Sequence, residues 1–273
     1  MVGDAASSDL LKRLRSTDTA IQAPAIVEAQ KSRAYHAAPV IADLLSSSDD
    51  AIRSSAADCL GYLGIKAPSR YGEALLPSLA DREAFVRSCA AESLGALRYE
   101  PAISGLGRLL MSDADELVRT CAAEALAAFD DSRVLSFAQP AIDDPDPTVR
   151  ANVVRVIALR GDGTALPMLT ERLNKETAFQ PRAALLGAVW LLGSGDALPR
   201  LLELLEGADL MQSTIVLNVL LDVISEAGRS SIVRDAAAVP DALARSKQRD
   251  EVVGRHADSV LNEMAKRLGA TSN

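Results

Sequence analysis

Hydrophobic and small residues recur along the chain at a spacing typical of helices, and similar segments return about every thirty residues. The clearest copy is AFVRSCAAESLGALR at 84–98, and near copies run over 50–64 and 116–130. The aligned copies share one arginine, and we call these five the register arginines: Arg53, Arg87, Arg119, Arg150 and Arg182. Their spacings are 34, 32, 31 and 32 residues, and Gln22 continues the series 31 residues before Arg53. This repetition predicts a stack of similar helical units instead of one closed core.

Each repeat is predicted to contain two helices. In the first helix, apolar or small residues stand three, four and seven places after the register arginine, a spacing that places them on one face. The residues of this stripe are Ala56, Ala57, Leu60, Ala90, Ala91, Leu94, Ala122, Ala123, Leu126, Val153, Val154, Ile157, Leu185, Leu186 and Val189. The second helix is clearest at 36–45, 164–173 and 196–205. Each of these segments has a proline in its first turn, where a missing N–H costs little.

The patterns predict an all-α fold, a right-handed α-α superhelix of about six to seven helical hairpins with a C-terminal capping helix. We expect a single solenoid over residues 9–268, a disordered tail at 1–8 and a frayed tail at 269–273. The predicted repeat units are 18–48, 49–81, 82–113, 114–144, 145–175, 176–207 and 208–245, followed by a cap at 249–268.

Composition narrows the possible partners. Of the 273 residues, 48% are hydrophobic but only 3% are aromatic, so the core must consist mainly of Ala, Leu, Val and Ile. The net charge of −8 argues against a nucleic-acid partner, because affinity for phosphate comes from clustered Lys and Arg. The same charge fits a basic protein partner. No apolar run is long enough to span a bilayer and the start is polar, so we expect no membrane partner and a cytoplasmic protein.

Residues that could carry chemistry are few. Cys59, Cys89 and Cys121 form no CxxC motif, and we expect them to be buried as small hydrophobic residues. The two histidines, His36 and His256, are isolated, so we expect no metal and no cofactor. The sequence has no glycine-rich phosphate loop, GxSxG motif or Cys–His pairing, so no catalytic residue is predicted.

The repeats resemble HEAT repeats, in particular the short type named for phycobilisome lyases, whose pattern is roughly D-x-x-V-R-x-x-A-x-x-A-L-G-x-L-G followed by A-x-P-x-L. The chain matches this pattern at Val86, Arg87, Ala90, Leu94 and Gly95, and nearly as well over 52–64. The resemblance covers about residues 18–206. It implies a binding scaffold more than an enzyme. HEAT-type hydroxylases bind iron through His-Glu pairs, which are absent because an alanine follows each histidine.

The resemblance also implies that the second helices line the concave face. Aligning them places a semi-apolar row there, and exposed Phe and Met in such a row would be interaction residues. The predicted partner-binding residues are Phe137, Met168, Arg200, Arg108, Glu171 and Trp190. As an alternative, Phe137 and Met168 could tuck into the core. Trp190 occupies a position where other repeats have Gly or Ala, so either it is exposed or its repeat packs differently.

Acidic residues precede each first helix. An acid stands four residues before the arginine in 49–53, 83–87, 115–119 and 146–150, an order that supports a helix through i,i+4 pairs. We interpret the arginines as part of an acid–arginine ladder that ties adjacent repeats together, and the alternative is a ladder that binds a partner. Stacking would align these acids along one rim, where they could attract a basic partner.

Together these features predict a non-catalytic protein–protein interaction scaffold that binds another protein on the concave face of the solenoid. The alternative is a bilin lyase or a chaperone-like protein acting on a tetrapyrrole-bearing protein, an activity with no short motif to test. A third class, nucleic-acid binders, is disfavoured by the charge.

Overall fold

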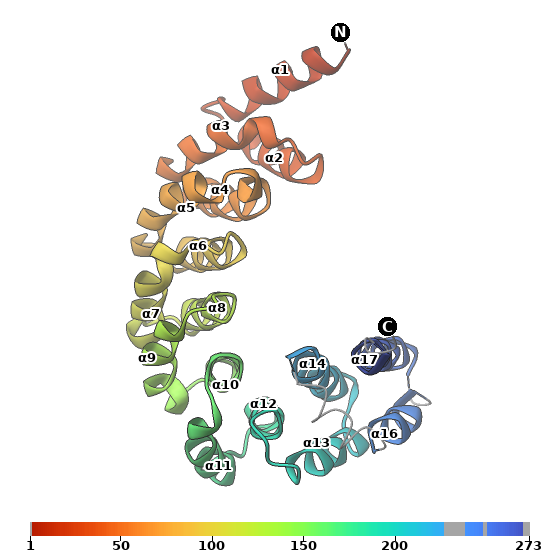
Figure 1. Ribbon diagram of the computed structural model, residues 1–273. Helices are drawn as coiled ribbons and strands as arrows, with labels where there is room; N and C mark the ends of the chain where they lie inside the picture. Colours follow the sequence, from red (N-terminus) through yellow and green to blue (C-terminus); the bar gives the residue numbers. More distant parts are fainter. Residues whose placement is uncertain (1, 227–237, 248–249, 270–273) are drawn as a thin grey trace. The chain divides into compact units, whose positions relative to one another are not determined.

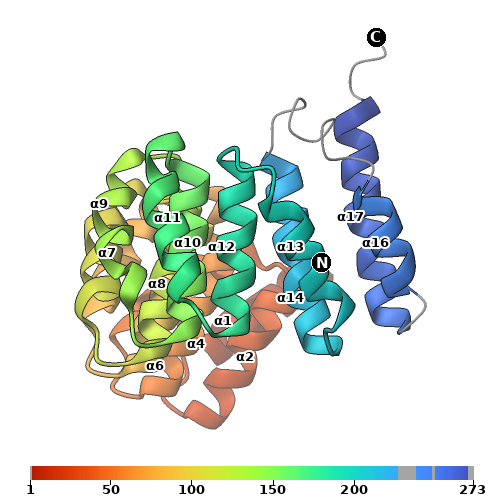
Figure 2. The ribbon, with the colours of Figure 1, turned by 90° about the horizontal axis from the view of Figure 1, so that it is seen from below.

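A computed structural model describes residues 2–226, 238–247 and 250–269 (Figure 1, Figure 2). The described residues form helices and connecting turns without any strand. The all-α solenoid class predicted from the repeat is therefore confirmed. By its internal contacts the chain divides into two compact units, Met1–Ala141 and Ile142–Asn273, called unit 1 and unit 2 below. The predicted division into repeat units stays a prediction.

Unit 1 contains nine α-helices among the described residues. They are α1 (Val2–Leu14), α2 (Thr19–Lys31), α3 (Ala38–Asp43), α4 (Asp50–Leu63), α5 (Pro68–Leu75), α6 (Ala84–Ala96), α7 (Ile103–Ser112), α8 (Glu116–Ala127) and α9 (Leu135–Ala138). Unit 2 contains the remaining described α-helices. They are α10 (Pro147–Arg160), α11 (Leu166–Lys175), α12 (Phe179–Leu191), α13 (Ala197–Glu206), α14 (Leu210–Glu226), α16 (Ala238–Lys247) and α17 (Glu251–Gly269).

The predicted stripe of the first helices forms the core. All fifteen of its residues are buried, and the apolar residue before each of Arg53, Arg87, Arg119 and Arg150 is buried as well. These helices begin where the sequence offers a cap: the side chains of Asp49, Asp115 and Asp146 accept hydrogen bonds from backbone N–H groups of the first turn. Helical periodicity and capping chemistry thus agree along the chain.

The amino-terminal segment differs from the prediction. Helix α1 begins at Val2, so residues 2–8 are helical instead of a disordered tail. Leu10 and Leu14 of α1 are buried, and Arg13 donates a hydrogen bond to Asp9 and forms an ion pair with Glu28 of α2. Packing against α2 supplies the tertiary contacts that a polar helix needs. At the other end, Gly269 closes α17, and the rest of the predicted frayed tail lies outside the described residues.

Within unit 1 the first helices α2, α4, α6 and α8 form one layer and the second helices form the other, and the unit bends toward the first-helix layer (Figure 1). Small residues explain this bend. A Cβ on Gly61 of α4 would lie 2.6 Å from Ser93 Oγ of α6, and a Cβ on Gly95 of α6 would lie 2.7 Å from Ala125 Cα of α8. The first helices therefore approach each other closely. The expectation that the second helices line the concave face is wrong for unit 1.

Candidate interaction surfaces

The register arginines join neighbouring repeats. Arg53 donates from Nε and Nη2 to the carboxylate of Asp81, at 2.7 and 3.0 Å, and Arg87 donates in the same way to Asp113, at 2.7 Å for both bonds. Each arginine also donates from Nη1 to two backbone carbonyls of the loop before its own helix, those of Ser47 and Ser48 for Arg53. One guanidinium thus holds the loops on both sides of a repeat.

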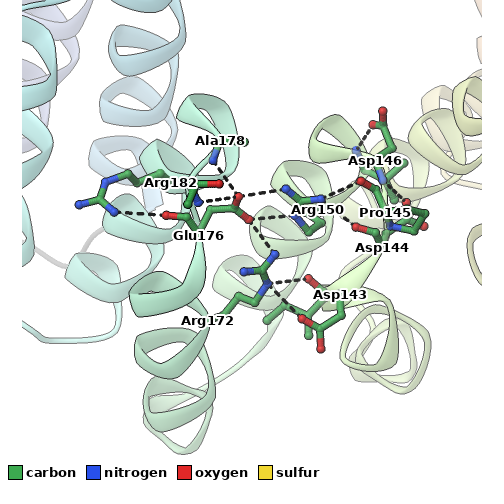
Figure 3. Close-up of polar contacts among 12 residues, drawn as sticks. Asp143, Asp144, Pro145, Asp146, Arg150, Arg172, Glu176, Ala178 and Arg182 are labelled. Carbon is green, nitrogen blue, oxygen red and sulfur yellow. Dashed lines mark hydrogen bonds and ion pairs between the residues drawn. The ribbon is translucent and has the colours of Figure 1, made fainter.

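Unit 2 repeats this arrangement (Figure 3). Arg150 donates to Glu176 Oε2 and Oε1 at 2.8 and 2.9 Å, and to the carbonyl oxygens of Asp144 and Pro145. Arg172 approaches the same carboxylate, with its Nη2 at 2.8 Å from Glu176 Oε2, and also forms an ion pair with Asp143. Glu176 is only 4% exposed, so two guanidinium groups neutralise a buried charge.

These ion pairs shift the pKa of the acids. Hydrogen bonds from Arg53 are the main reason that the pKa of Asp81 is lowered. Burial alone would raise the pKa of Asp113 and Glu176, but the hydrogen bonds and positive charges of their arginines outweigh it and lower both.

Three of the four acids that stand four residues before the arginines, Asp49, Asp115 and Asp146, cap helices through their side chains, whereas Glu83 makes no such cap. Asp115 accepts from the N–H groups of Leu117 and Val118, and Asp146 from those of Thr148 and Val149. A carboxylate oriented toward the backbone is not available to the arginine one turn later. The capping acids and the paired register arginines thus have structural roles, while Asp50, Glu83 and Glu116 of the rim are exposed. Attraction of a basic partner by the rim stays a prediction.

The predicted partner-binding residues of the second helices are placed as follows. Phe137 of α9 is half-buried, because its ring lies over Gly107 of α7, where a Cβ would meet ring atoms at 2.4 Å. In unit 1, Arg108 is exposed beside Asp113 in a shallow hollow between α7 and the end of the preceding repeat. In unit 2, Met168 and Arg200 are half-buried, and the exposed Glu171 pairs with Lys175. The structure does not bring these residues together within one unit.

Trp190 is buried, with 2% of its surface exposed, so the prediction that it binds a partner is wrong. The reason lies one turn earlier in α12. In α4 and α6 the close helix contact falls on Gly61 and Gly95, eight residues after the register arginine. In α12 it falls on Gly187, five residues after Arg182, where a Cβ would lie 2.4 Å from Val219 Cγ1 of α14. The displaced contact leaves room for an indole at position 190.

The first-helix layer of unit 1 exposes several large apolar side chains that the sequence reasoning missed. Phe85 and Tyr62 are each 61% exposed, Ile65 is 52% exposed and Leu117 is 49% exposed. Phe85 and Leu117 stand two residues before their register arginines, at equivalent places on the neighbouring helices α6 and α8. The other repeats have a small or polar residue at this position. The large apolar residues at 85 and 117 were therefore the sequence signal that could have indicated an exposed apolar surface.

Acidic side chains lie between these apolar residues. Asp58, Glu92 and Glu124 all stand five residues after a register arginine, on α4, α6 and α8. Gln30 Nε2 donates to Asp58 Oδ2 at 3.1 Å, and Cys121 Sγ donates to Glu92 Oε1 at 3.0 Å. Asp58 and Glu92 share a hollow of about 330 Å³ with Tyr62 and Ile65. We call this surface of α4, α6 and α8 the inner face of unit 1.

Unit 2 has a groove on its first-helix layer, with a volume of about 310 Å³. Its floor includes Ala184 and Ala188 of α12, whose small side chains leave space between α10 and α14. Across this space Arg155 Nε reaches Asp222 Oδ2 at 2.9 Å, although both side chains remain almost half exposed. Burial in the groove raises the pKa of Asp222, against the effect of Arg155.

The three cysteines are buried, as predicted. Burial raises the pKa of Cys59 to about 12 and that of Cys89 to about 11, and the pKa of Cys121 is raised as well, so none is a nucleophile at neutral pH. Among the described residues no group of His, Cys, Asp or Glu is arranged to hold a metal ion. Within the same part of the chain, no helix has the length and hydrophobicity needed to cross a membrane.

A protein-family model described as HEAT repeats matches this chain over residues 103–190 and 137–218. Residues 103–218 thus contain HEAT repeats. The resemblance inferred from the register arginines and the small-residue stripe is therefore confirmed. No curated protein matches the chain in sequence.

HEAT-repeat proteins of known structure share the fold. The complex of CpcE and CpcF of phycocyanin lyase from Nostoc sp. matches with a TM-score of 0.61 and 22% identity, over 85% of this chain and 94% of that chain. YibA of Escherichia coli matches with a TM-score of 0.57 and 16% identity, over 95% and 92%. Kap95, the yeast importin-β, in complex with Nup1 gives 0.63 and 16%, over 96% of this chain and 40% of that chain. At these identities the likeness is one of fold alone.

Proposed function

We propose that this HEAT-repeat chain is a non-catalytic scaffold that binds another protein through the inner face of unit 1. The observation that carries the proposal is the exposure of Phe85, Leu117 and Tyr62 on the neighbouring first helices α6, α8 and α4, together with Ile65 in the turn after α4. Large apolar side chains exposed on one surface mark interaction sites, and aromatic residues contribute strongly to binding. The proposed site lies on the concave side, as expected from the sequence, but it is formed by first helices instead of second helices.

Two further observations support a protein partner. The exposed apolar residues lie on neighbouring first helices next to solvent-facing acids, a mixture of side chains typical of protein-binding surfaces. Among the proteins of similar fold, Kap95 was solved with Nup1, and CpcE was solved with CpcF. Both complexes illustrate protein binding by this type of solenoid.

The test is a cross-linking pull-down from the native lysate with the full chain as bait. Replacing both Phe85 and Leu117 with Ser removes two exposed apolar groups, and recovery of specific partners should fall severalfold. Met111→Ser is the matched control, because Met111 is similarly exposed, at 48%, but lies on the second helix α7. A third variant, Phe137→Ala with Met168→Ala, tests the second-helix residues predicted from the sequence.

Equal recovery by the wild type and by the Phe85 and Leu117 variant would reject the inner face as the binding surface. Loss confined to the Phe137 and Met168 variant would favour the second helices instead. The bilin-lyase alternative is tested separately by adding a bilin to the purified chain. We expect an unchanged absorbance spectrum, and a shifted spectrum would favour the alternative.

A further inference from the structure

We infer that the inner face of unit 1 binds an extended, polyproline II-like segment of its partner that carries a cation at every third residue. This inference rests on the proposed scaffold function and specifies the chemistry of the partner. It follows from three features of the surface, which are the order of its acids, the apolar side chains beside them and the spacing of the helices.

The acids form a row across three neighbouring helices. Asp58, Glu92 and Glu124 occupy one repeat position on α4, α6 and α8, which pack side by side. Cys121 of α8 donates to Glu92 of α6, so the carboxylate of Glu92 reaches the neighbouring helix. The acids therefore occupy a line of equivalent positions that crosses the helices.

The first two acids of the row are available to a ligand. Within the described part of the chain, Asp58 and Glu92 form no ion pair, and their hydrogen bonds come from neutral donors, Gln30 and Cys121. This distinguishes them from Asp81 and Asp113, which bind arginines of the fold. A carboxylate that faces solvent without a cation favours a positively charged partner.

Apolar side chains flank the row on both sides. Phe85 and Leu117 lie seven residues, or about two turns, before Glu92 and Glu124 on the same helix faces. Tyr62 and Ile65 lie beyond Asp58 on the opposite side and line the hollow that Asp58 and Glu92 share. A segment lying along the row would thus meet carboxylates in its middle and apolar groups along both edges.

The spacing selects the conformation of that segment. Packed helices lie about 8–10 Å apart, so equivalent positions on α4, α6 and α8, including those that carry the acids, recur at about that interval. A polyproline II segment rises about 3.1 Å per residue with three residues per turn, which places every third side chain on one side at intervals of about 9 Å. A β-strand returns to the same side every second residue, at about 6.6 Å, and does not match. The two intervening residues of each turn point toward the apolar edges.

The experiment measures fluorescence anisotropy of labelled synthetic peptides with the full chain at low salt. The matching probe repeats Lys-Pro-Leu four times. One control has the same composition with its lysines grouped at one end, and another has Glu in place of Lys. A third control is a helical peptide with one Lys every seven residues, which reproduces the spacing in a different conformation. We expect the matching probe to bind about tenfold more tightly than any control and to weaken as salt rises.

Variants locate the binding site. Asp58→Asn combined with Glu92→Gln removes two charges but keeps the acceptors for Gln30 and Cys121, and should weaken binding of the matching probe about five- to tenfold. Glu73→Gln, on the exposed surface of the second helix α5, is the matched control and should change nothing. Melting curves check that the variants fold. If they do not fold, the salt dependence of peptide binding by the wild type still tests the inference.

The inference would be overturned if the matching and grouped peptides bound equally or if the helical peptide bound more tightly. It would also be overturned if Glu73→Gln weakened binding as much as Asp58→Asn with Glu92→Gln. Binding that is insensitive to salt would overturn it as well. The proposed function is tested independently by the pull-down. It is rejected if the Phe85 and Leu117 variant recovers as much of the native partners as the wild type does. If native partners are lost by that variant but no peptide binds, the inference fails and the scaffold function stands.

Discussion

At the scale of single residues, the bonds of the register arginines are the best-defined polar contacts of the protein. In Arg53, Arg87 and Arg150 the guanidinium uses two of its donors on a carboxylate of the next repeat and a third on the loop of its own repeat. Bidentate pairing of this kind fixes both the distance and the angle between two loops, which a lysine could not do.

Removal of such an arginine should be costly. Arg150→Ala leaves the 4% exposed Glu176 with Arg172 as its remaining cationic partner, and we expect a loss of about 3 kcal/mol in the free energy of unfolding. Arg155→Ala is the control. It breaks an ion pair whose side chains are 45% and 44% exposed, and should cost less than about 1 kcal/mol. Urea unfolding of both variants measures the difference, and similar losses would contradict this account.

The sequence could identify the arginines but not their partners. The acid four residues earlier is the obvious candidate on a helix, yet its carboxylate is used by the backbone N–H groups of the first turn. The true partners, Asp81, Asp113 and Glu176, stand 28, 26 and 26 residues after their arginines. That regular separation was visible in the sequence, but its meaning depends on how one repeat stacks on the next.

At the scale of helices, close packing between first helices determines both the bend of unit 1 and the choice of small residues. Gly95→Ala places a methyl group 2.7 Å from Ala125 Cα, a backbone atom that cannot move aside easily. We expect a loss of about 1–3 kcal/mol in stability, despite the better helix propensity of alanine.

Gly163→Ala provides the control for this substitution. No atom lies within 4 Å of a Cβ built on Gly163, so its stability should stay within about 0.5 kcal/mol of the wild type. Thermal melts of the two variants compare them directly. If Gly95→Ala were as stable as the wild type, close approach of α6 and α8 would not explain the glycine.

Helix packing also explains why the candidate site was predicted less well than the fold. The buried stripe follows from local periodicity and was predicted residue by residue. Which helices line the concave side, and whether Trp190 is buried, both depend on how closely neighbouring helices approach each other. Close approach occurs at Gly61, Gly95 and Gly187. A single residue at one repeat position, such as Trp190, shows that a repeat differs but not how its neighbour accommodates it.

At the scale of the whole molecule, several structural carboxylates respond to pH in the same direction. The pKa values of Asp81, Asp113 and Glu176 are lowered in the folded state. A lowered pKa contributes stability that is complete above the unfolded-state value, about 4, and is lost as the pH falls through the folded value. The pKa of Asp222 is raised and acts in the opposite direction, but its half-exposed side chain makes that effect small.

The free energy of unfolding should therefore be nearly constant from neutral pH to about pH 5 and should fall steeply below about pH 4. Urea titrations at several pH values test this expectation. Arg150→Ala should show a shallower decline, because Glu176 then loses part of the charge that lowers its pKa. A stability that rises on acidification would contradict the sign of these shifts.

The reach of each register arginine into the following repeat also decides where the polypeptide can be shortened. A fragment that stops between Arg87 and Asp113 would keep a largely covered guanidinium and discard the carboxylate that neutralises it. A fragment that stops just after Asp113 would keep both. Truncation boundaries in a chain of this kind therefore belong behind the acid of the next loop, and not at the last residue of a hairpin.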